Sequence, residues 1–489
     1  MRAEDVAREA QFRDGFTLVD YAEVGLPIFR LTIEAVTTST RALPTIQEFA
    51  MRCLELGETD EGSIGRMLGL KDDIIRAAFD TLVVEGFVAR TAVVSNLSSF
   101  ALTQSGYERL EVEAKEVVQE EMIVIDYDAM RRMPVKLAGE NVVRANELKT
   151  FGAVEIRPYP SDPPNVSELS IPEIRRVIRR QSGDDFRHNV LALKRIVRRN
   201  NVFREAVALV FAADKGDEVQ VAFAIDGKLS ESHERAFAEN GGPKKMGFVR
   251  MISDDGVRRR LERLVGRDAV RSLPDPLSLA ANRKEEAEAR AQIRSIEPAA
   301  ELSGTRRTTN PAVVALNAAK ERHAVAMHDL DAVQLRPLAC YEQNELLHEA
   351  VTNTRRNLLV TSAGLQPTLL TQHMMRELDR LAGERVSITV ASFLKPQLEP
   401  RGGDFYDPLA DLSKRTQKDR MQLVTTPRSD FFFLIQDDDL AVISNRPFFG
   451  EMVRRSGFQR IDGYVTRDRS MVAKVKEMAA DATRARRNA

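Results

Sequence analysis

Two short apolar runs on either side of a polar turn mark the C-terminal third of the chain. Phe431–Ile435 and Leu440–Ile443 are runs of apolar residues, and Asp437–Asp439 lies between them. Runs of this length around a tight polar turn predict the two buried strands of a hairpin. Upstream, the pattern predicts an α/β alternation, with helices at 344–355 and 369–382 and strands at 357–362, 386–392 and 421–425.

A different pattern lies nearer the N-terminus. Between Thr45 and Glu113 the apolar residues first recur at helical spacing and then alternate with polar ones. Glycines and capping residues separate the helical segments. The pattern predicts helices from Thr45, Asp60 and Lys71, strands at 86–94 and 99–102 joined at Ser95-Asn96, and a closing helix from Thr103.

The middle of the chain combines segments with helical spacing of apolar residues and segments in which apolar and polar residues alternate. A charged helical continuation over 113–120 precedes predicted strands at 121–127 and 152–157. A break at Ser182-Gly183 divides the basic stretch Ile171–Arg204 into two predicted helices. Further on, we expect a hairpin of 205–213 and 219–226, a helix at 231–239, a loop at 241–245 and a strand at 247–252.

Composition and cysteine content exclude several classes of protein. The formal net charge is −1, and no Cys/His spacing matches a zinc site, so neither bulk charge nor a metal motif indicates a partner. Cys53 and Cys340 lie far apart in apolar surroundings, which predicts two unpaired core residues. The charged first residues and the short apolar runs predict a cytoplasmic protein without a signal peptide or membrane contact, and nothing indicates a cofactor.

The most basic stretch, Ile171–Arg204, is the strongest local charge signal. Its apolar residues are predicted to face inward and its bases outward, which suits binding to a DNA backbone. A solvated face, or ion pairing with the acidic 45–113 segment of the same or a neighbouring chain, stays open as the alternative. The candidate nucleic-acid-binding residues here are Arg175, Arg176, Arg179, Arg180, Lys194, Arg195, Arg198 and Arg199.

The segment between Thr45 and Glu113 resembles a winged helix-turn-helix domain. Residues 65–70, 84–90 and 101–106 are typical of bacterial winged-helix regulators. The resemblance implies a third helix in the DNA major groove. It adds Lys71, Arg76 and Arg90 as candidate phosphate contacts.

The charge of this segment argues against strong DNA binding. Twelve acidic residues stand against six basic ones, and Asp72 and Asp73 begin the helix that would enter the groove. Acidic residues there weaken the phosphate contacts that supply most non-specific affinity. Contact with another protein is therefore an equal alternative.

The C-terminal hairpin resembles the motif of the phospholipase D-like superfamily. In that family a His, a Lys two residues later and an Asp five residues after that precede a strand ending in Gly-Ser, and then an Asn. Asp430 and Phe432 stand at the His and Lys positions, whereas Asp437 matches. The Gly, Ser and later Asn positions hold Ser444, Asn445 and Phe448.

This resemblance implies the fold without the chemistry. Phosphodiester cleavage in that family needs an imidazole nucleophile and a Lys that holds the phosphate charge. Asp430 would repel phosphate, Phe432 donates no hydrogen bond, and the chain contains no other His-x-Lys pair. We therefore expect one inactive lobe with no catalytic or metal-binding residues. Active members pair two lobes, so the resemblance also implies homodimerisation as an option.

The expected architecture is a multidomain α/β chain, since its length suggests about three domains. The predicted segments are an N-terminal extension (1–40), a winged helix (41–115), a basic α+β middle domain (116–272), a helical linker (273–336), a single degenerate phospholipase D-like lobe (337–478) and a basic tail (479–489).

This combination resembles a bacterial accessory protein of a nucleic-acid-handling system, anti-phage defence included. The first hypothesis is a non-catalytic nucleic-acid-binding or scaffolding subunit that grips DNA backbone and contacts protein partners. The second is a transcriptional regulator, like archaeal sugar sensors that join a winged helix to a phospholipase D-like ligand domain. The third is a nuclease whose acid-rich turn Asp437–Asp439, near Asp430, holds a divalent ion.

Overall fold

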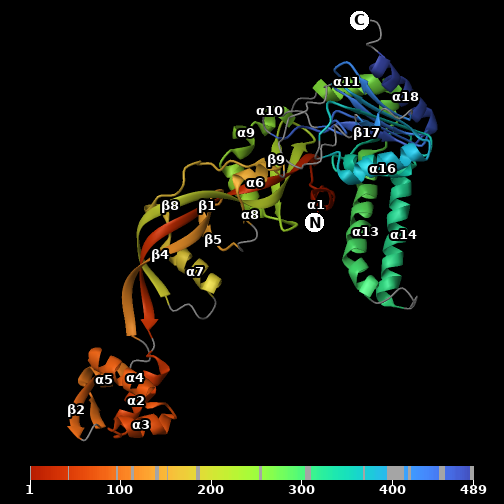
Figure 1. The fold of residues 1–489 in the computed structure, drawn as a ribbon. Coiled ribbons are helices and arrows are strands. Elements are labelled where there is room, and N and C mark those ends of the chain that lie inside the picture. Colours follow the sequence, from red (N-terminus) through yellow and green to blue (C-terminus); the bar gives the residue numbers. More distant parts are fainter. Residues whose placement is uncertain are drawn as a thin grey trace. The chain divides into compact units, whose positions relative to one another are not determined.

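The computed structural model shows a mixed α/β protein built from several sheets and helices (Figure 1). The described residues are 2–41, 43–94, 97–111, 115–137, 142–150, 152–182, 188–252, 256–302, 310–366, 369–393, 412, 414–416, 420–450 and 457–484. Contacts divide the chain into unit 1, residues 1–27, 143–161 and 203–489, and unit 2, residues 28–142 and 162–202. The long strands β1 (Phe16–Arg41) and β8 (His188–Ala213) contribute to both units.

Part of unit 2 is a small helical domain with its own apolar core. Its elements are α2 (Thr45–Glu55), α3 (Glu61–Leu68), α4 (Asp72–Val84), β2 (Val88–Val94), β3 (Leu97–Leu102) and α5 (Gln104–Glu111). Asp60 caps α3 by accepting the Ser63 N–H at 2.8 Å, and Gly69 ends that helix in the left-handed conformation. The Phe79 and Phe100 rings stack in the core, 4.4 Å apart. The predicted helices and hairpin are confirmed, while the junction Ser95-Asn96 lies outside the described residues.

The rest of unit 2 is an antiparallel sheet covered by one helix. β1 pairs with β4 (Lys115–Asp128) from Ile28 opposite Asp128 to Arg41 opposite Lys115. β4 pairs in turn with β5 (Met133–Val135). The helix α7 (Ile171–Ser182) buries Ile174 and Ile178 in the core formed by this sheet and Val190 of β8. The short 3₁₀ helix η2 spans Val166–Glu168.

Two segments predicted as helices are strands. Residues 115–120, the described part of the helical continuation over 113–120, lie in β4. The second basic helix is also wrong, because residues 188–204 lie in β8, where Val190 is buried but Val197 is 49% exposed. Both segments contain β-branched residues among charged ones, and pairing with neighbouring strands outweighs their local helical pattern.

The middle part of unit 1 continues the same sheet. Here β8 pairs antiparallel with β9 (Val219–Ile225), and β10 (Lys228–Leu229) follows, so the predicted hairpin is confirmed. β7 (Val154–Glu155) pairs with β1 in parallel. The other elements here are β6 (Val142–Val143), α6 (Ala145–Thr150), α8 (Glu231–Glu239), α9 (Gly242–Lys245) and α10 (Phe248–Ile252).

The predicted loop at 241–245 and strand at 247–252 are both wrong, because α9 and α10 occupy these residues. Phe248 and Ile252 are fully buried and lie four residues apart, which places them on one face of a helix. Gly247, with φ of 79°, separates the two helices. An apolar run this short fits a strand or a buried helical turn equally well.

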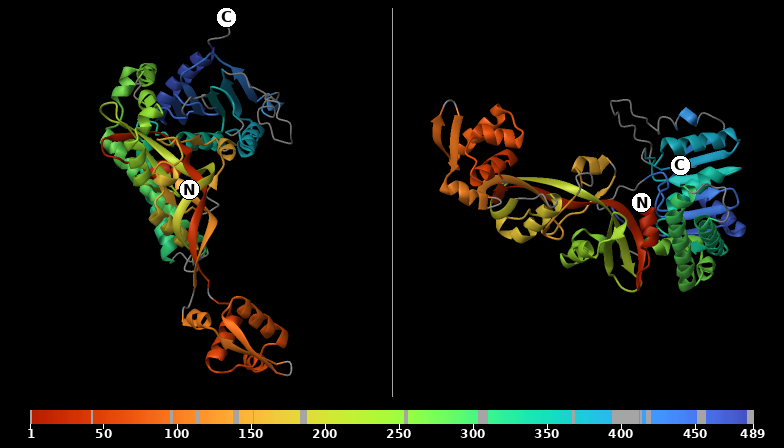
Figure 2. Two further views of the ribbon diagram at one scale, coloured as in Figure 1. Left: turned by 90° about the vertical axis from the view of Figure 1, so that its left-hand side faces the viewer. Right: turned by 90° about the horizontal axis from the view of Figure 1, so that it is seen from below.

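Unit 1 contains further helices that precede the strands of the C-terminal domain along the chain. They are α1 (Ala3–Glu9), α11 (Gly256–Val265), α12 (Arg267–Arg271), α13 (Pro276–Leu302) and α14 (Pro311–Asp331). α13 and α14 lie side by side, as Figures 1 and 2 show, and fall within the segment predicted as a helical linker, 273–336. Arg8 of α1 is buried and donates to Glu286 of α13 at 2.6 Å. The predicted flexible connection at 303–309 lies outside the described residues.

The C-terminal domain is a seven-stranded sheet between two helical layers. Its strand order is β11-β17-β16-β15-β12-β13-β14, with β12, β13 and β14 parallel to one another and the other pairs antiparallel. The strands are β11 (Arg336–Pro337), β12 (Asn357–Ser362), β13 (Ser387–Ser392), β14 (Met421–Thr425), β15 (Phe432–Gln436), β16 (Leu440–Ser444) and β17 (Gly463–Thr466). The predicted hairpin is β15–β16.

Helices bury both faces of this sheet, so β15 and β16 consist of buried residues throughout. On one face, α15 (Gln343–Asn353) and α16 (Gln372–Gly383) pack through Leu347 and Leu378. On the other face lie α11 and α18 (Arg469–Arg484), which includes the first residues of the predicted basic tail, 479–489. Residues 394–411 and residues 485–489 of the tail lie outside the described residues.

Both cysteines, Cys53 and Cys340, are buried and unpaired, as predicted. Across the described ranges, the model contains no helix that combines the length and apolar character needed to cross a bilayer.

Candidate functional site

The C-terminal sheet brings several strand ends to one edge. The carboxyl ends of β12, β13 and β14 share this edge because the three strands are parallel. β15 runs antiparallel to β12, so its first residues lie at the same edge. In open α/β sheets, ligands bind beyond the carboxyl ends of the parallel strands. This edge is therefore the candidate site of the C-terminal domain.

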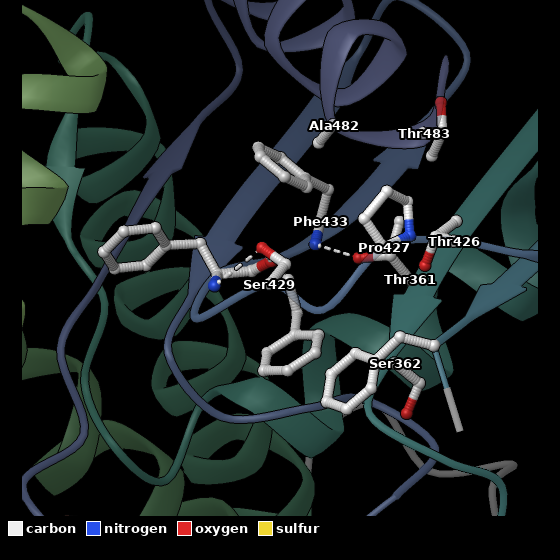
Figure 3. Close-up of a pocket in the computed structure, with 11 residues that line it drawn as sticks. Thr361, Ser362, Thr426, Pro427, Ser429, Phe433, Ala482 and Thr483 are labelled. Carbon is white, nitrogen blue, oxygen red and sulfur yellow. Dashed lines mark hydrogen bonds between the residues drawn. The ribbon is translucent and has the colours of Figure 1, made fainter. Parts of the chain in front are cut away.

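A shallow pocket lies at this edge, and phenylalanine rings form part of its lining beside serine, threonine and proline side chains (Figure 3). It has room for about one water molecule. Phe432 is only 1% exposed and stacks on Phe393 with ring centroids 6.3 Å apart. The Phe433 N–H donates to Thr361 Oγ1 at 2.7 Å (Figure 3). The described residues therefore leave little free space in this pocket.

The two positions that carry chemistry in the phospholipase D-like motif are occupied by residues with other roles. Phe432, at the Lys position, is part of the apolar core. Asp430, at the His position, has a half-exposed side chain that forms an ion pair with Arg260 of α11 at 3.1 Å. No histidine is among the described residues that line the pocket. These two motif positions therefore supply neither an imidazole nor a lysine for this chemistry.

Asp437 has a structural role. Its carboxylate is 3% exposed and accepts the backbone N–H groups of Arg355, Arg356 and Asn357, each at 2.8 Å. Asp437 also has a φ of 46°, which fits a tight hairpin turn. The carboxylate therefore fixes the β15–β16 turn to the start of β12.

The remaining positions of the motif are also satisfied within the domain. The Ser444 hydroxyl donates to Gln343 Oε1 at 2.8 Å and accepts the Arg446 N–H at 3.0 Å. Asn445 Nδ2 donates to the Arg460 carbonyl at 2.8 Å. Phe448 is buried in the main core. These residues hold the framework together and do not face a ligand site.

The acid-rich turn does not form a metal site in the described residues. Asp438 forms ion pairs with Lys476 and, at 3.1 Å, with Arg356. The hydrogen bond from Lys476 lowers the pKa of Asp438 below its usual value. With the Asp437 carboxylate occupied by backbone N–H groups, the turn has no open pair of carboxylates. No group of three or more His, Cys, Asp or Glu side chains suited to a metal occurs in the part of the chain that the structure describes.

The basic residues of α7 divide into one structural residue and an exposed pair. Arg175 is half-buried, and its Nε donates to the Val190 carbonyl of β8 at 2.7 Å. Arg176 and Arg179 are exposed on the face opposite the buried Ile174 and Ile178. The side chain of Arg180 lies outside the described residues.

The bases of β8 are arranged differently from the predicted helix face. Neighbouring residues of a strand point to opposite sides, so Lys194, Arg195, Arg198 and Arg199 do not form one row. Arg195 donates to Glu34 at 2.7 Å, and Lys194 forms ion pairs with Glu34 and Glu120. The hydrogen bond from Arg195 lowers the pKa of Glu34. Arg198 contacts Asn200 at 3.3 Å, and Arg199 is exposed.

In the small helical domain, two of the three candidate bases are paired with acidic residues. Arg76 lies 3.4 Å from Glu61, and Arg90 lies 3.3 Å from Asp80 and stacks over Phe100. Lys71 is exposed at the N-terminus of α4.

A group of arginines in α11 and α12 is not among the residues predicted from the sequence. Arg258, Arg259, Arg260, Arg263, Arg267 and Arg271 are all exposed there. The signal that identifies them in the sequence is the four-residue spacing from Arg259 to Arg271 within a segment that contains few acidic residues.

Comparisons with known proteins assign no family to the chain. No protein-family model matches it, and no curated protein matches it. NucT from Helicobacter pylori is similar at 10% identity and a TM-score of 0.21, over 30% of this chain and 92% of that chain. Phosphatidylserine synthase from Haemophilus influenzae Rd KW20 is similar at 10% identity and a TM-score of 0.22, over 41% of this chain and 53% of that chain. Similarity at this level carries no information about the function of this chain.

Proposed function

We propose that the chain is a non-catalytic nucleic-acid-binding or scaffolding subunit that contacts DNA backbone through exposed bases of α7 and β8. The exposed pair Arg176 and Arg179, which faces away from the buried side of α7, carries this proposal. Arg199 of β8 adds a further exposed charge in the same unit. Phosphate contacts by such side chains supply affinity without base recognition.

We further propose that the C-terminal domain is a degenerate phospholipase D-like lobe with a scaffolding role. The burial of Phe432 and the small pocket support the absence of phosphodiester chemistry. The sheet order and the anchoring of Asp437 support the retained framework. A single lobe of this kind suits contact with a second copy or with protein partners of a larger bacterial assembly, anti-phage defence systems included.

The small helical domain of unit 2 is proposed to be a winged helix that contacts protein more strongly than DNA. Asp72, Asp73 and Asp80 are exposed on α4, and two of the candidate bases already pair with acidic neighbours. Repulsion between these carboxylates and phosphates weakens any approach of α4 to DNA. The regulator hypothesis therefore depends on Lys71 alone among the candidate bases of this domain.

A salt series with a charge-neutralised variant tests the DNA contact. The affinity of the purified chain for a labelled duplex is measured between about 50 and 200 mM salt, where phosphate contacts dominate the change. The double variant Arg176→Gln/Arg179→Gln is expected to reduce the slope of log K against log salt by about 2, since each contact contributes about 0.9.

The matched control replaces two exposed arginines on α8 and α16, Arg235→Gln and Arg376→Gln, which changes the net charge equally. This control is expected to keep the wild-type slope. If the two variants show the same slope, the contact between α7 and DNA is wrong.

A further inference from the structure

Four arginines recur at intervals of four residues along α11 and α12. They are Arg259, Arg263, Arg267 and Arg271. We infer that this row, on the C-terminal domain, is a second phosphate-binding surface that holds nucleic-acid backbone. The inference shares its ligand class with the proposed function but concerns different residues in the other compact unit.

Apolar packing orients α11 with its basic side outward. Leu261 and Val265 are buried in one core with Phe433 and Ile435 of β15 and with residues of α18. Arg259 and Arg263 are exposed, and their spacing places them one above the other on the outer face. The helix is fixed by its buried face, so the arginine side chains need little further ordering of the backbone when they bind.

Several of these arginines have no carboxylate partner. Over the described ranges, no carboxylate lies within ion-pair distance of Arg259, Arg263 or Arg267. Glu262 is occupied by Arg258 at 3.2 Å, and Asp268 lies 4.0 Å from Arg271. This differs from β8, where Glu34 and Glu120 already pair with Lys194 and Arg195. The α11–α12 surface therefore keeps its positive charge available to a ligand.

The spacing and the residue type both suit phosphate. Four residues rise about 6 Å along an α-helix, which is roughly two nucleotide steps of one strand at about 3.4 Å each. The guanidinium group presents a planar set of donors that can hold phosphate oxygens in pairs. Gly266, with φ of 97°, breaks the helix between Arg263 and Arg267, so the row bends at this point.

A polyanion fits this surface better than a protein partner does. Protein interfaces are rich in aromatic and other large apolar residues at their centre. The large apolar residues of α11 are buried or half-buried, so the exposed side presents mainly charge. An acidic protein surface, such as α4 of another copy, is the competing ligand that the experiment distinguishes.

Arg260 links this surface to the edge of the sheet. It forms an ion pair with Asp430, the residue at the motif's His position. The surface therefore begins beside the shallow pocket. The domain thus presents its phosphate-binding cations on α11 and α12, and not inside the pocket.

The test uses the full-length chain with Arg259→Gln/Arg263→Gln, the α7 variant Arg176→Gln/Arg179→Gln, their combination and the control Arg235→Gln/Arg376→Gln. The α11 variant is expected to lower the slope of log K for DNA against log salt by about 2, and the combination by about 4. An unchanged slope in the α11 variant overturns the inference, even if the α7 variant changes. An unchanged slope in the α7 variant with a lower one in the α11 variant leaves the inference standing and rejects the contact with α7.

Sedimentation of the same variants distinguishes the competing ligand. We expect wild-type self-association in the α11 variant. Weaker self-association together with wild-type DNA binding would assign the row to an acidic protein surface and overturn the inference.

Discussion

Replacing Asp437 by Ala is expected to destabilise the C-terminal domain by about 4–5 kcal/mol, the low end of what three charge-assisted hydrogen bonds contribute. The substitution removes three charge-assisted hydrogen bonds, to the N–H groups of Arg355, Arg356 and Asn357. Hydrogen bonds to charged groups contribute about 1.5–3 kcal/mol each, and groups left unpaired add a desolvation cost. Urea denaturation measures the loss, and hydrogen exchange at 355–357 reports where it occurs.

Asp438→Ala is the matched control, one residue along the same turn. Asp438 is half-exposed, and its partners are the surface side chains of Lys476 and Arg356. Solvent screens exposed ion pairs strongly, so this variant is expected to remain close to wild type. Equal stability of the two variants, or unchanged exchange at 355–357 in Asp437→Ala, would show that Asp437 does not anchor the turn.

Replacing Glu342 by Gln is expected to cost about 3–5 kcal/mol, because the substitution leaves a buried charge without its main partner. Glu342 accepts two hydrogen bonds from Arg336, at 3.0 and 2.8 Å, and one from the Ala339 N–H at 2.8 Å. Arg336 is 2% exposed. Burial by itself raises the pKa of Glu342, but Arg336 and Arg283 outweigh it and hold that pKa at about 2.

The sign of the pH dependence follows from this lowered pKa. The unfolded chain gives Glu342 a pKa of about 4.3, above the folded value. The pair therefore stabilises the fold fully above this pH, and the stabilisation is lost as the pH falls towards about 2. Urea midpoints between neutral and acidic pH should fall more steeply for wild type than for Glu342→Gln.

The double variant Arg336→Met/Glu342→Met provides the control. Removing both charges avoids the uncompensated arginine, so the double variant is expected to be more stable than Glu342→Gln alone. A double variant that is less stable than the single one would show that the loss comes from packing and not from the buried charge.

Asp437 matches the motif whereas Asp430 and Phe432 depart from it, and this difference has a physical explanation. Asp437 is held by backbone N–H groups of another strand, so its loss affects the fold whether or not the domain has catalytic activity. Asp430 is a half-exposed residue at the edge, and Phe432 fills the space where a Lys would reach a ligand. The buried aromatic ring of Phe432 adds apolar burial, worth about 2–3 kcal/mol.

Much of the fold could be predicted where local signals agreed. The β15–β16 hairpin follows from two apolar runs and a polar turn, and the α2–α5 region from capping residues and glycines. Residues 188–204 were predicted to be a helix and are a strand. A basic stretch with β-branched residues fits the spacing of a helix and that of a strand equally well. Pairing with distant strands of the sheet decided the outcome. No local pattern specifies which strands will become neighbours.

The candidate site could be predicted only in part. The motif in the sequence shows that Asp430 and Phe432 replace its His and Lys. Only the structure shows that Arg260 pairs with Asp430 and that Phe393 stacks on Phe432. The ion pairs of Lys194 and Arg195 depend on Glu34, which is remote in sequence, so their neutralisation could not be anticipated. The arginines of α11 and α12 were visible in the sequence, but their exposure depends on how Leu261 and Val265 pack.

The most direct test of the central claim, binding without cleavage, is one experiment on the wild-type chain. Its affinity for a labelled duplex is measured over a salt series, and the integrity of the DNA is checked in the same samples, with and without magnesium. We expect intact DNA and a slope of about −4.5 or steeper, from five or more exposed arginines on the two surfaces at about 0.9 each. No binding at low salt, or DNA cleaved in proportion to the protein added, would contradict it.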